Sequence, residues 1–161
     1  MQGIEITPLN AADRDWANTL LIERWGSTQI VSHGQSHDCS ALPGFVARYD
    51  SMRAGLITYR MYNDECEIMT LDSLVEGCGI GTELLAEVEI TAQEEGCGCT
   101  FLITTNDNLH ALGFYQRRGY RVAAVYPNAI DAARALKPQI PVIGMNKIPL
   151  HDEIELHKLF F

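Results

Sequence analysis

The sequence predicts a single α+β domain over residues 1–161, with a mixed, mostly antiparallel sheet flanked by helices. The chain has 161 residues, of which 47% are apolar, and this is enough material for one sizeable core. Segments with strand-like and helix-like spacing alternate along it. The sequence contains no internal repeat, low-complexity tract or interdomain linker.

The first half of the chain predicts strands around one helix. Residues 13–25 have the spacing of an amphipathic helix, and Gly26 supplies its stop signal. Residues 27–42 are rich in Gly, His and other polar residues, which predicts a loop with some extended structure. The strands expected here are 4–9, 45–49, 56–62 and 66–71, with a turn at Asp50-Ser51 joining the second and third.

The second half of the chain predicts helices and strands in alternation. A helix over residues 80–95 carries Ile80, Leu84 and Val88 as its core stripe. A second helix begins at Asn106 or Asn108, either of which can cap it, and ends at Gly119. The other elements expected are strands at 100–104, 120–126 and 142–148 and a short helix at 128–137.

The stretch Glu76-Gly77-Cys78-Gly79-Ile80-Gly81 joins an expected strand to an expected helix. Glycines on alternate residues leave backbone N–H groups bare, so a ligand can approach them closely. Unpaired N–H groups and the dipole at a helix N-terminus favour an anion, typically a phosphate. This stretch therefore predicts a turn that holds a phosphorylated ligand.

The spacing of the glycines weakens other interpretations. A dinucleotide-binding fingerprint has Gly-x-Gly-x-x-Gly, whereas this chain has Gly-x-Gly-x-Gly. A nucleotide-triphosphate loop continues with Gly-Lys-Ser/Thr, which does not follow here. A tight strand-to-helix turn with no ligand is the alternative that the glycines alone leave open.

A second motif, Asn-x-x-Ala-x-x-Phe-Tyr-x-x-x-Gly-Tyr, covers residues 108–120. Its helical spacing places Asn108, Ala111 and Tyr115 on one face. Together with the glycine loop, it resembles the GNAT superfamily of acetyl-CoA-dependent N-acetyltransferases, in which both motifs occur in this order and separation. The resemblance covers most of the chain and is weakest before residue 45. Glu76 departs from the family, which usually has Gln or Arg there, and we expect its side chain to point to solvent.

The resemblance implies a GNAT-like fold, in which two neighbouring strands of a twisted sheet splay apart beside a bulge. Backbone groups at the splay would pair with the pantetheine arm of acetyl-CoA, and the glycine loop would hold its pyrophosphate. No metal is expected, because the potential donors His33, His37 and Cys39 lack a fourth partner at short spacing. The acetyl-CoA-binding residues implied are Leu71, Asp72, Ser73, Gly77, Cys78, Gly79, Ile80, Gly81, Thr82, Asn108 and Tyr115.

The resemblance also implies a reaction, in which a primary amine attacks the thioester directly in a ternary complex without an acyl-enzyme. Tyr115 stands where the family's tyrosine protonates the leaving thiolate. Some members use a glutamate on the strand before the glycine loop as general base, so Glu67 is the first candidate and Asp72 the second. Strict alternation places these two carboxylates on opposite faces of that strand. A core tyrosine and a solvated strand carboxylate are the structural alternatives.

The overall composition excludes some classes of protein. A net charge of −9 and a pI near 4.9 argue against nucleic-acid binding, which needs a basic face. No apolar run approaches the roughly 18 residues of a membrane span, and the N-terminus lacks the features of a signal peptide. Five cysteines in an irregular pattern indicate reduced thiols, so we expect a cytoplasmic protein.

The sequence does not identify the acceptor. In the family that the chain resembles, the region matching residues 16–43 shapes the acceptor pocket, and either a small-molecule or a peptide amine fits. The main rival function is a non-catalytic acyl-CoA sensor or interaction domain, and an NAD(P)H-dependent oxidoreductase is a distant third. The apolar run 140–145 and the Leu159-Phe160-Phe161 end predict a homodimer, because exposed apolar groups favour burial.

Overall fold

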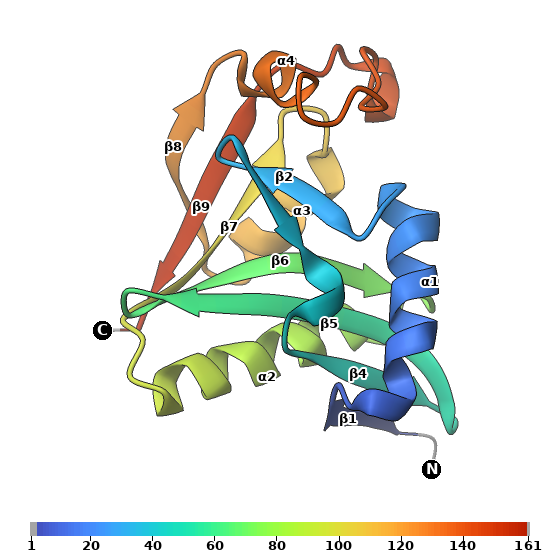
Figure 1. Cartoon of the computed structure of the whole chain (residues 1–161). Coiled ribbons are helices and arrows are strands. Elements are labelled where there is room, and N and C mark those ends of the chain that lie inside the picture. Colours follow the sequence, from blue (N-terminus) through green and yellow to red (C-terminus); the bar gives the residue numbers. More distant parts are fainter. Residues whose placement is uncertain (1–2, 161) are drawn as a thin grey trace. The chain divides into compact units, whose positions relative to one another are not determined.

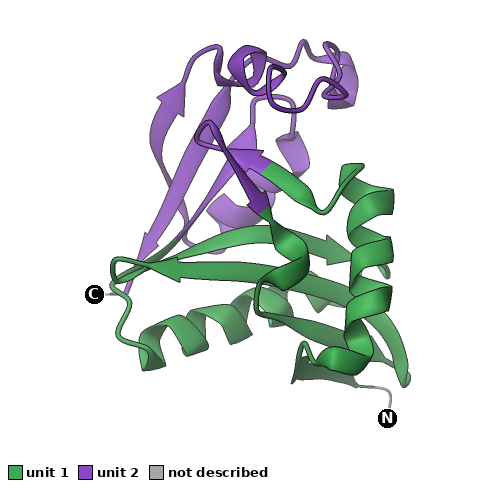
Figure 2. Cartoon of the chain, viewed as in Figure 1, with its two compact units in different colours: residues 1–30, 38–100 green, residues 31–37, 101–161 purple. Residues whose placement is uncertain are grey.

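The computed structural model describes residues 3–160, which form two compact units (Figure 2). Unit 1 takes in the chain up to Ile30 together with residues 38–100. Unit 2 takes in residues 31–37 and the chain from Phe101 onward.

Unit 1 consists of four antiparallel strands with two long helices (Figure 1). The strands lie in the order β1-β4-β5-β6, and the turn at Asp50-Ser51 joins β4 to β5 with positive φ at both residues. The elements are β1 (Ile4–Pro8), η1 (Ala11–Asp13), α1 (Arg14–Trp25), η2 (Cys39–Ala41), β4 (Gly44–Tyr49), β5 (Met52–Tyr62), β6 (Glu65–Ser73) and α2 (Ile80–Glu94).

The two helices of unit 1 cover opposite faces of its strands. Leu56 on β5 belongs to the buried cluster that contains Ala17, Leu20 and Leu21 of α1. Its neighbour Gly55 faces α2, because a Cβ built there would lie 2.6 Å from Ile80 Cγ2. Successive residues of a strand point to opposite faces, so α1 lies over one face and α2 over the other.

The segment expected to be loop with extended structure forms a two-stranded hairpin, β2 (Gln29–Ser32) and β3 (Gln35–Asp38). Its tip, residues 31–37, belongs to unit 2, where His33 contacts Glu155 and Tyr126. The hairpin therefore carries the chain from unit 1 to unit 2 and back.

In unit 2, β9 lies between β7 and β8, and β8 and β9 run antiparallel. Strand β7 begins in unit 1 and ends in unit 2. From β7 onward the elements are β7 (Cys99–Thr105), α3 (Leu109–Arg117), β8 (Arg121–Tyr126), α4 (Ala129–Ala133), η3 (Met145–Lys147) and β9 (Glu153–Leu159).

The strand expected at residues 142–148 is wrong. That segment is a loop with a 3-10 turn, in which Asn146 and Lys147 have positive φ. Buried Asp107 fastens it, since Asp107 Oδ2 accepts a hydrogen bond from Met145 N at 2.8 Å. The last strand is β9, which the sequence signals only by alternating Ile154 and Leu156 with polar residues.

The observed class is α+β with a mostly antiparallel sheet flanked by helices, as predicted. The splaying of two strands stays a prediction, as does the single domain over 1–161. Across residues 3–160, no helix is both long and apolar enough to span a membrane. Phe161, part of the C-terminal aromatic pair, lies outside the described residues.

Candidate functional site

The glycine loop leaves β6 and opens α2, as predicted. Gly79 is the N-cap of α2, with a left-handed backbone at φ 85°. Within residues 3–160 no side chain caps this helix start, so the donors of its first turn are not occupied in that way. A Cβ built on Gly77 or Gly79 meets no described atom within 4 Å, so the loop borders open space. The helix start can therefore receive an anion.

Other residues of this segment hold the loop in place. Ile80 is buried beneath the first turn of α2. At the end of β6, Ser73 Oγ donates to the carbonyl of Val75 at 3.0 Å, and Leu74 N donates to Ala54 O at 2.8 Å. Glu76 is exposed, as expected for a carboxylate beside a proposed anion site.

A bulge in β6 changes which residues share a face. The register pairs Thr58 with Thr70 and then Tyr59 with Ile68, so Met69 is the extra residue. On β5, Leu56, Thr58 and Arg60 alternate and so share one face, which is the face of Leu56 and α1. Their partners on β6 are Asp72, Thr70 and Glu67, which therefore share it too.

The expected separation of Glu67 and Asp72 onto opposite faces is thus wrong. Strict alternation assumes an uninterrupted strand, and one inserted residue reverses the face of everything beyond it. Both carboxylates lie on the α1 face of β6.

The two carboxylates have different partners. Glu67 is buried and forms an ion pair with Arg60, whose Nη1 lies 3.2 Å from Glu67 Oε1. Asp72 accepts a hydrogen bond from the indole Nε1 of Trp25 at 3.0 Å. Burial raises the pKa of Asp72, and the Trp25 hydrogen bond and the Arg24 charge oppose this only in part. A cation compensates the first carboxylate, and a neutral donor holds the second.

The second motif lies on α3 in unit 2. Asn108 is its N-cap, and its side-chain oxygen accepts from Ala111 N at 3.1 Å. Tyr115 is 6% exposed, and its ring packs edge-to-face against Phe114 and Tyr120, with centroids 5.1 and 5.4 Å away. Packing therefore fixes the ring of the proposed proton donor.

The sequence analysis did not foresee the pairing of Trp25 with Asp72. In the sequence, Trp25 lies within the expected acceptor region, residues 16–43, and 47 residues separate it from Asp72. No local pattern links an indole at the end of a helix to a carboxylate at the end of a distant strand. The available signal was the stop at Gly26, which places Trp25 at the C-terminus of α1.

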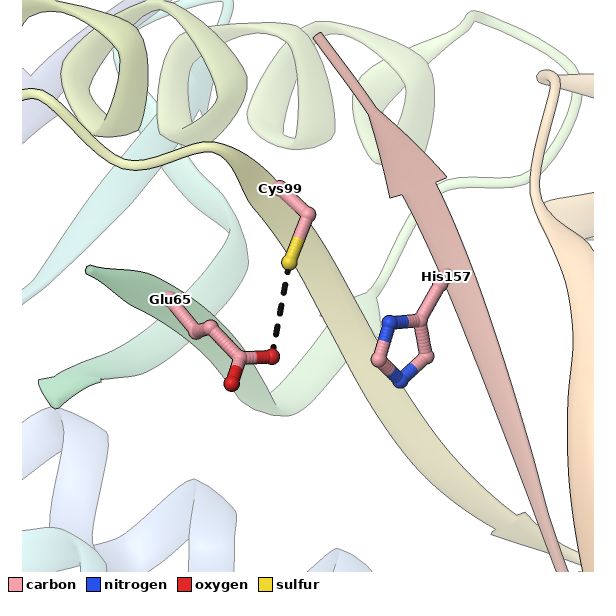
Figure 3. Close-up of side chains that lie close together, drawn as sticks. All are labelled: Glu65, Cys99 and His157. Atoms are coloured by element: carbon pink, nitrogen blue, oxygen red, sulfur yellow. Dashed lines mark hydrogen bonds between the residues drawn. The ribbon is translucent and has the colours of Figure 1, made fainter. Parts of the chain in front are cut away.

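Further polar side chains lie away from the glycine loop. In unit 1, Cys99 Sγ donates to Glu65 Oε2 at 3.5 Å (Figure 3). His157, drawn in the same figure, belongs to unit 2, where its Nε2 lies 2.5 Å from Glu155 Oε2. Glu155 Oε1 also contacts His33 Nε2 at 2.8 Å and accepts from the Tyr126 hydroxyl at 2.9 Å. This Glu155 cluster ties the hairpin tip to β8 and β9.

Comparison with known proteins places these features in a family. The model of the Acetyltransferase (GNAT) family matches residues 12–120. The protein YxbD of Bacillus subtilis (strain 168) is 42% identical over 156 residues, covering 96% of this chain and 98% of YxbD. The chain therefore belongs to the GNAT acetyltransferase family.

Two further similarities are more limited. Blasticidin-S acetyltransferase of Streptomyces morookaense is 39% identical over 62 residues, covering 38% of this chain and 45% of that enzyme. A GNAT family acetyltransferase from Elizabethkingia anophelis, solved with acetyl-CoA bound, has a TM-score of 0.73 at 20% identity and covers 98% of each chain. At that identity, the structural match establishes the fold.

Proposed function

We propose that this GNAT family member transfers the acetyl group of acetyl-CoA to a primary amine by direct attack, in a ternary complex without an acyl-enzyme. The observation that carries the proposal is the uncapped N-terminus of α2 behind the glycine loop. Its first-turn N–H groups and dipole suit the pyrophosphate of acetyl-CoA. The residues assigned to this anion are Gly77, Cys78, Gly79, Ile80, Gly81 and Thr82.

The end of β6 is assigned to the pantetheine arm and the thioester. Backbone groups of Leu71, Asp72 and Ser73 pair with the amides of pantetheine, and an N–H near Leu71 polarises the thioester carbonyl. Acetyl-CoA supplies an activated acyl group with a good leaving thiolate. In unit 2, Asn108 anchors the pantetheine and Tyr115 donates its hydroxyl proton to the departing sulfur.

The acceptor is a small-molecule or peptide amine, and nucleic acid and membrane are not proposed as partners. The excess of carboxylates, net charge −9, favours the approach of a cationic amine. The five cysteines, all within residues 3–160, form no disulfide, which supports a reducing, cytoplasmic setting. Exposed Val142, Ile143 and Met145 support a homodimer, which light scattering would test.

The test of acetyl-CoA binding uses two matched glycines. Gly79 and Gly96 both have left-handed backbones, at φ 85° and 84°, and both have room for a Cβ. A valine at either position therefore introduces similar backbone strain, of about 1–2 kcal/mol. We expect Gly79→Val to abolish acetyl-CoA binding in calorimetry and Gly96→Val, after the other end of α2, to preserve it. Absence of binding to the wild-type protein would refute the proposed function.

Turnover separates the enzyme from its main rival. Thiol release from acetyl-CoA would be measured with a panel of primary amines that includes a polyamine, an aminoglycoside and peptides with free N-termini. Binding of acetyl-CoA without turnover on any of them would favour a non-catalytic acyl-CoA sensor. Binding of NAD(P)H in place of acetyl-CoA would favour an oxidoreductase.

A further inference from the structure

We propose that Asp72 is the general base of this reaction and that Trp25 is its positioning residue. The inference rests on the proposed function and chooses Asp72 over the other candidate carboxylate of β6, Glu67. It depends on where the carboxylate lies, on its hydrogen bonds and on its contrast with Glu67.

Asp72 lies at the end of β6 that leads into the glycine loop. Its neighbours Leu71 and Ser73 are the residues proposed to bind the thioester end of acetyl-CoA. The side chain lies on the α1 face of the strand, where Trp25 ends α1. A base beside the thioester can take a proton from an amine that is about to attack it.

One oxygen of Asp72 is held and the other is available. The indole of Trp25 donates to Oδ2, and among residues 3–160 Oδ1 receives no hydrogen bond. Within residues 3–160, Asn18 Oδ1 is the side-chain polar atom that is both fully enclosed and without a hydrogen-bond partner. Asp72 Oδ1 also lacks a partner, so it is not fully enclosed and must reach the surface. Asp72 is 9% exposed, which leaves a narrow approach to a fixed carboxylate oxygen.

Electrostatics favours Asp72 over Glu67. Arg60 pairs with Glu67 at 3.2 Å, so a cation already occupies that carboxylate, whereas Asp72 has no ion pair within residues 3–160. For Asp72, burial is the largest influence and raises the pKa, while the indole hydrogen bond and Arg24 lower it less. A carboxylate with a raised pKa is the stronger base at neutral pH.

The proposed step balances in protons and electrons. The acceptor ammonium gives one proton to Asp72 Oδ1, and the freed nitrogen lone pair forms the new C–N bond at the thioester carbon. The C–S bond then breaks, and the departing sulfur takes the hydroxyl proton of Tyr115. The nitrogen of the adduct still carries one proton too many for an amide, and it loses that proton to solvent as the C–S bond breaks. Solvent also removes the proton from Asp72 and returns one to Tyr115, so the net reaction releases one proton.

The decisive experiment is a pH profile of kcat for the full chain with acetyl-CoA and the best amine of the panel. The wild-type rate should fall at low pH as Asp72 becomes protonated. Asp72→Asn should lower kcat about 10²–10³-fold and remove this acidic limb. Glu67→Gln is the competing variant, because Glu67 is the other candidate base, and the proposal expects it to keep the acidic limb.

Two further variants separate positioning from proton transfer. Trp25→Phe removes the hydrogen bond that lowers the pKa of Asp72, so the acidic limb should move to higher pH while acetyl-CoA affinity is unchanged. Tyr115→Phe should lower kcat and leave the acidic limb where it is. A simple loss of packing would not move the acidic limb of the kcat profile in Trp25→Phe and leave it in place in Tyr115→Phe.

A readout independent of activity is the indole N–H resonance of Trp25 in nitrogen-15 NMR. It should shift with pH as Asp72 titrates in the wild-type protein and stop doing so in Asp72→Asn, with Trp16 as the internal reference. The proposal is overturned if Asp72→Asn keeps the rate and the limb, if Glu67→Gln removes the limb, or if the Trp25 resonance does not respond. If the wild type acetylates no amine, the proposed function fails, and the NMR titration still tests the pair.

Discussion

Asp13 and Asp72 are both buried in unit 1, but they lie in regions with opposite electrostatics. Asp13 precedes α1, and its Oδ1 lies 2.9 Å from Arg48 Nη2 and 3.0 Å from Arg53 Nε. Asp72 ends β6 and has the neutral indole of Trp25 as its donor. Two arginines form ion pairs with the first carboxylate, whereas the second accepts an indole hydrogen bond and has no ion pair within residues 3–160.

The pKa values of the two carboxyls move in opposite directions. For Asp13, burial raises the pKa, but the hydrogen bonds from Asn10 and Arg53 and the nearby arginine charges together bring it below its ordinary value. For Asp72, burial outweighs the indole and Arg24, and the pKa rises. A fully compensated buried charge stabilises a fold, and a partly compensated one keeps proton affinity for chemistry.

The largest effect is expected at Asp13. Asp13→Asn leaves Arg48 and Arg53 without their shared carboxylate, so the free energy of unfolding should fall by about 3 kcal/mol at pH 7. The pKa of Asp13 is lower in the folded state than in the unfolded state. Its contribution to the free energy of unfolding is therefore present above the unfolded-state pKa and is lost as pH falls through the folded-state pKa. Urea unfolding at several pH values measures both effects. Equal stability of Asp13→Asn and the wild type at pH 7 would show that the Asp13 carboxylate does not stabilise the fold.

Glu155 in unit 2 provides an intermediate case, because titratable imidazoles and a phenol surround it. Burial raises its pKa, but the hydrogen bonds from His157 and Tyr126 and the nearby His33 charge lower it overall. Glu155→Gln should cost about 1.5 kcal/mol at pH 7, since it removes hydrogen bonds to a charged acceptor. This loss should shrink as pH falls through the folded pKa of Glu155.

Urea unfolding also tests this case, with Tyr126→Phe as the matched control that removes one donor. The phenol pKa of Tyr126, raised by burial and by Glu155, should return toward its ordinary value in Glu155→Gln. Ultraviolet titration of the tyrosines would detect the change. An unchanged tyrosine titration would show that Glu155 does not act on Tyr126.

The smallest effect, and the opposite sign, is expected at Asp72. Asp72→Asn keeps an acceptor for the indole and removes a charge that burial disfavours, so stability at pH 7 should rise by about 0.5–1 kcal/mol. The pKa of Asp72 is higher in the folded state than in the unfolded state. The wild type therefore has its full free energy of unfolding below the unfolded-state pKa, and it loses part of it as pH rises through the folded-state pKa. The gain of the variant should therefore disappear in acid. A loss of stability comparable to that of Asp13→Asn would make Asp72 a structural residue.

Elements that depend on neighbouring residues could be predicted from the sequence. The stop of α1 at Gly26, the turn at Asp50-Ser51 and the cap of α3 by Asn108 all follow from local backbone preferences. The glycine loop belongs to this group, because its conformation and the helix start behind it are specified within a few residues. These features were sufficient to indicate the family, which the family comparison confirms.

Tertiary structure decided the features that depend on distant partners. The face that each residue of β6 presents depends on a bulge at Met69, which exists only in register with β5. Residues 142–148 are apolar enough for a strand, but hydrogen bonds to Asp107 hold them as a loop. The pairing of Trp25 with Asp72 joins the ends of a helix and a strand that are 47 residues apart. The sequence by itself determined the family of this protein, because the motifs that indicate it are encoded by short-range spacing. Only the folded chain decided which of the two β6 carboxylates has an ion pair and which has an indole donor, because burial and pairing depend on contacts between remote segments.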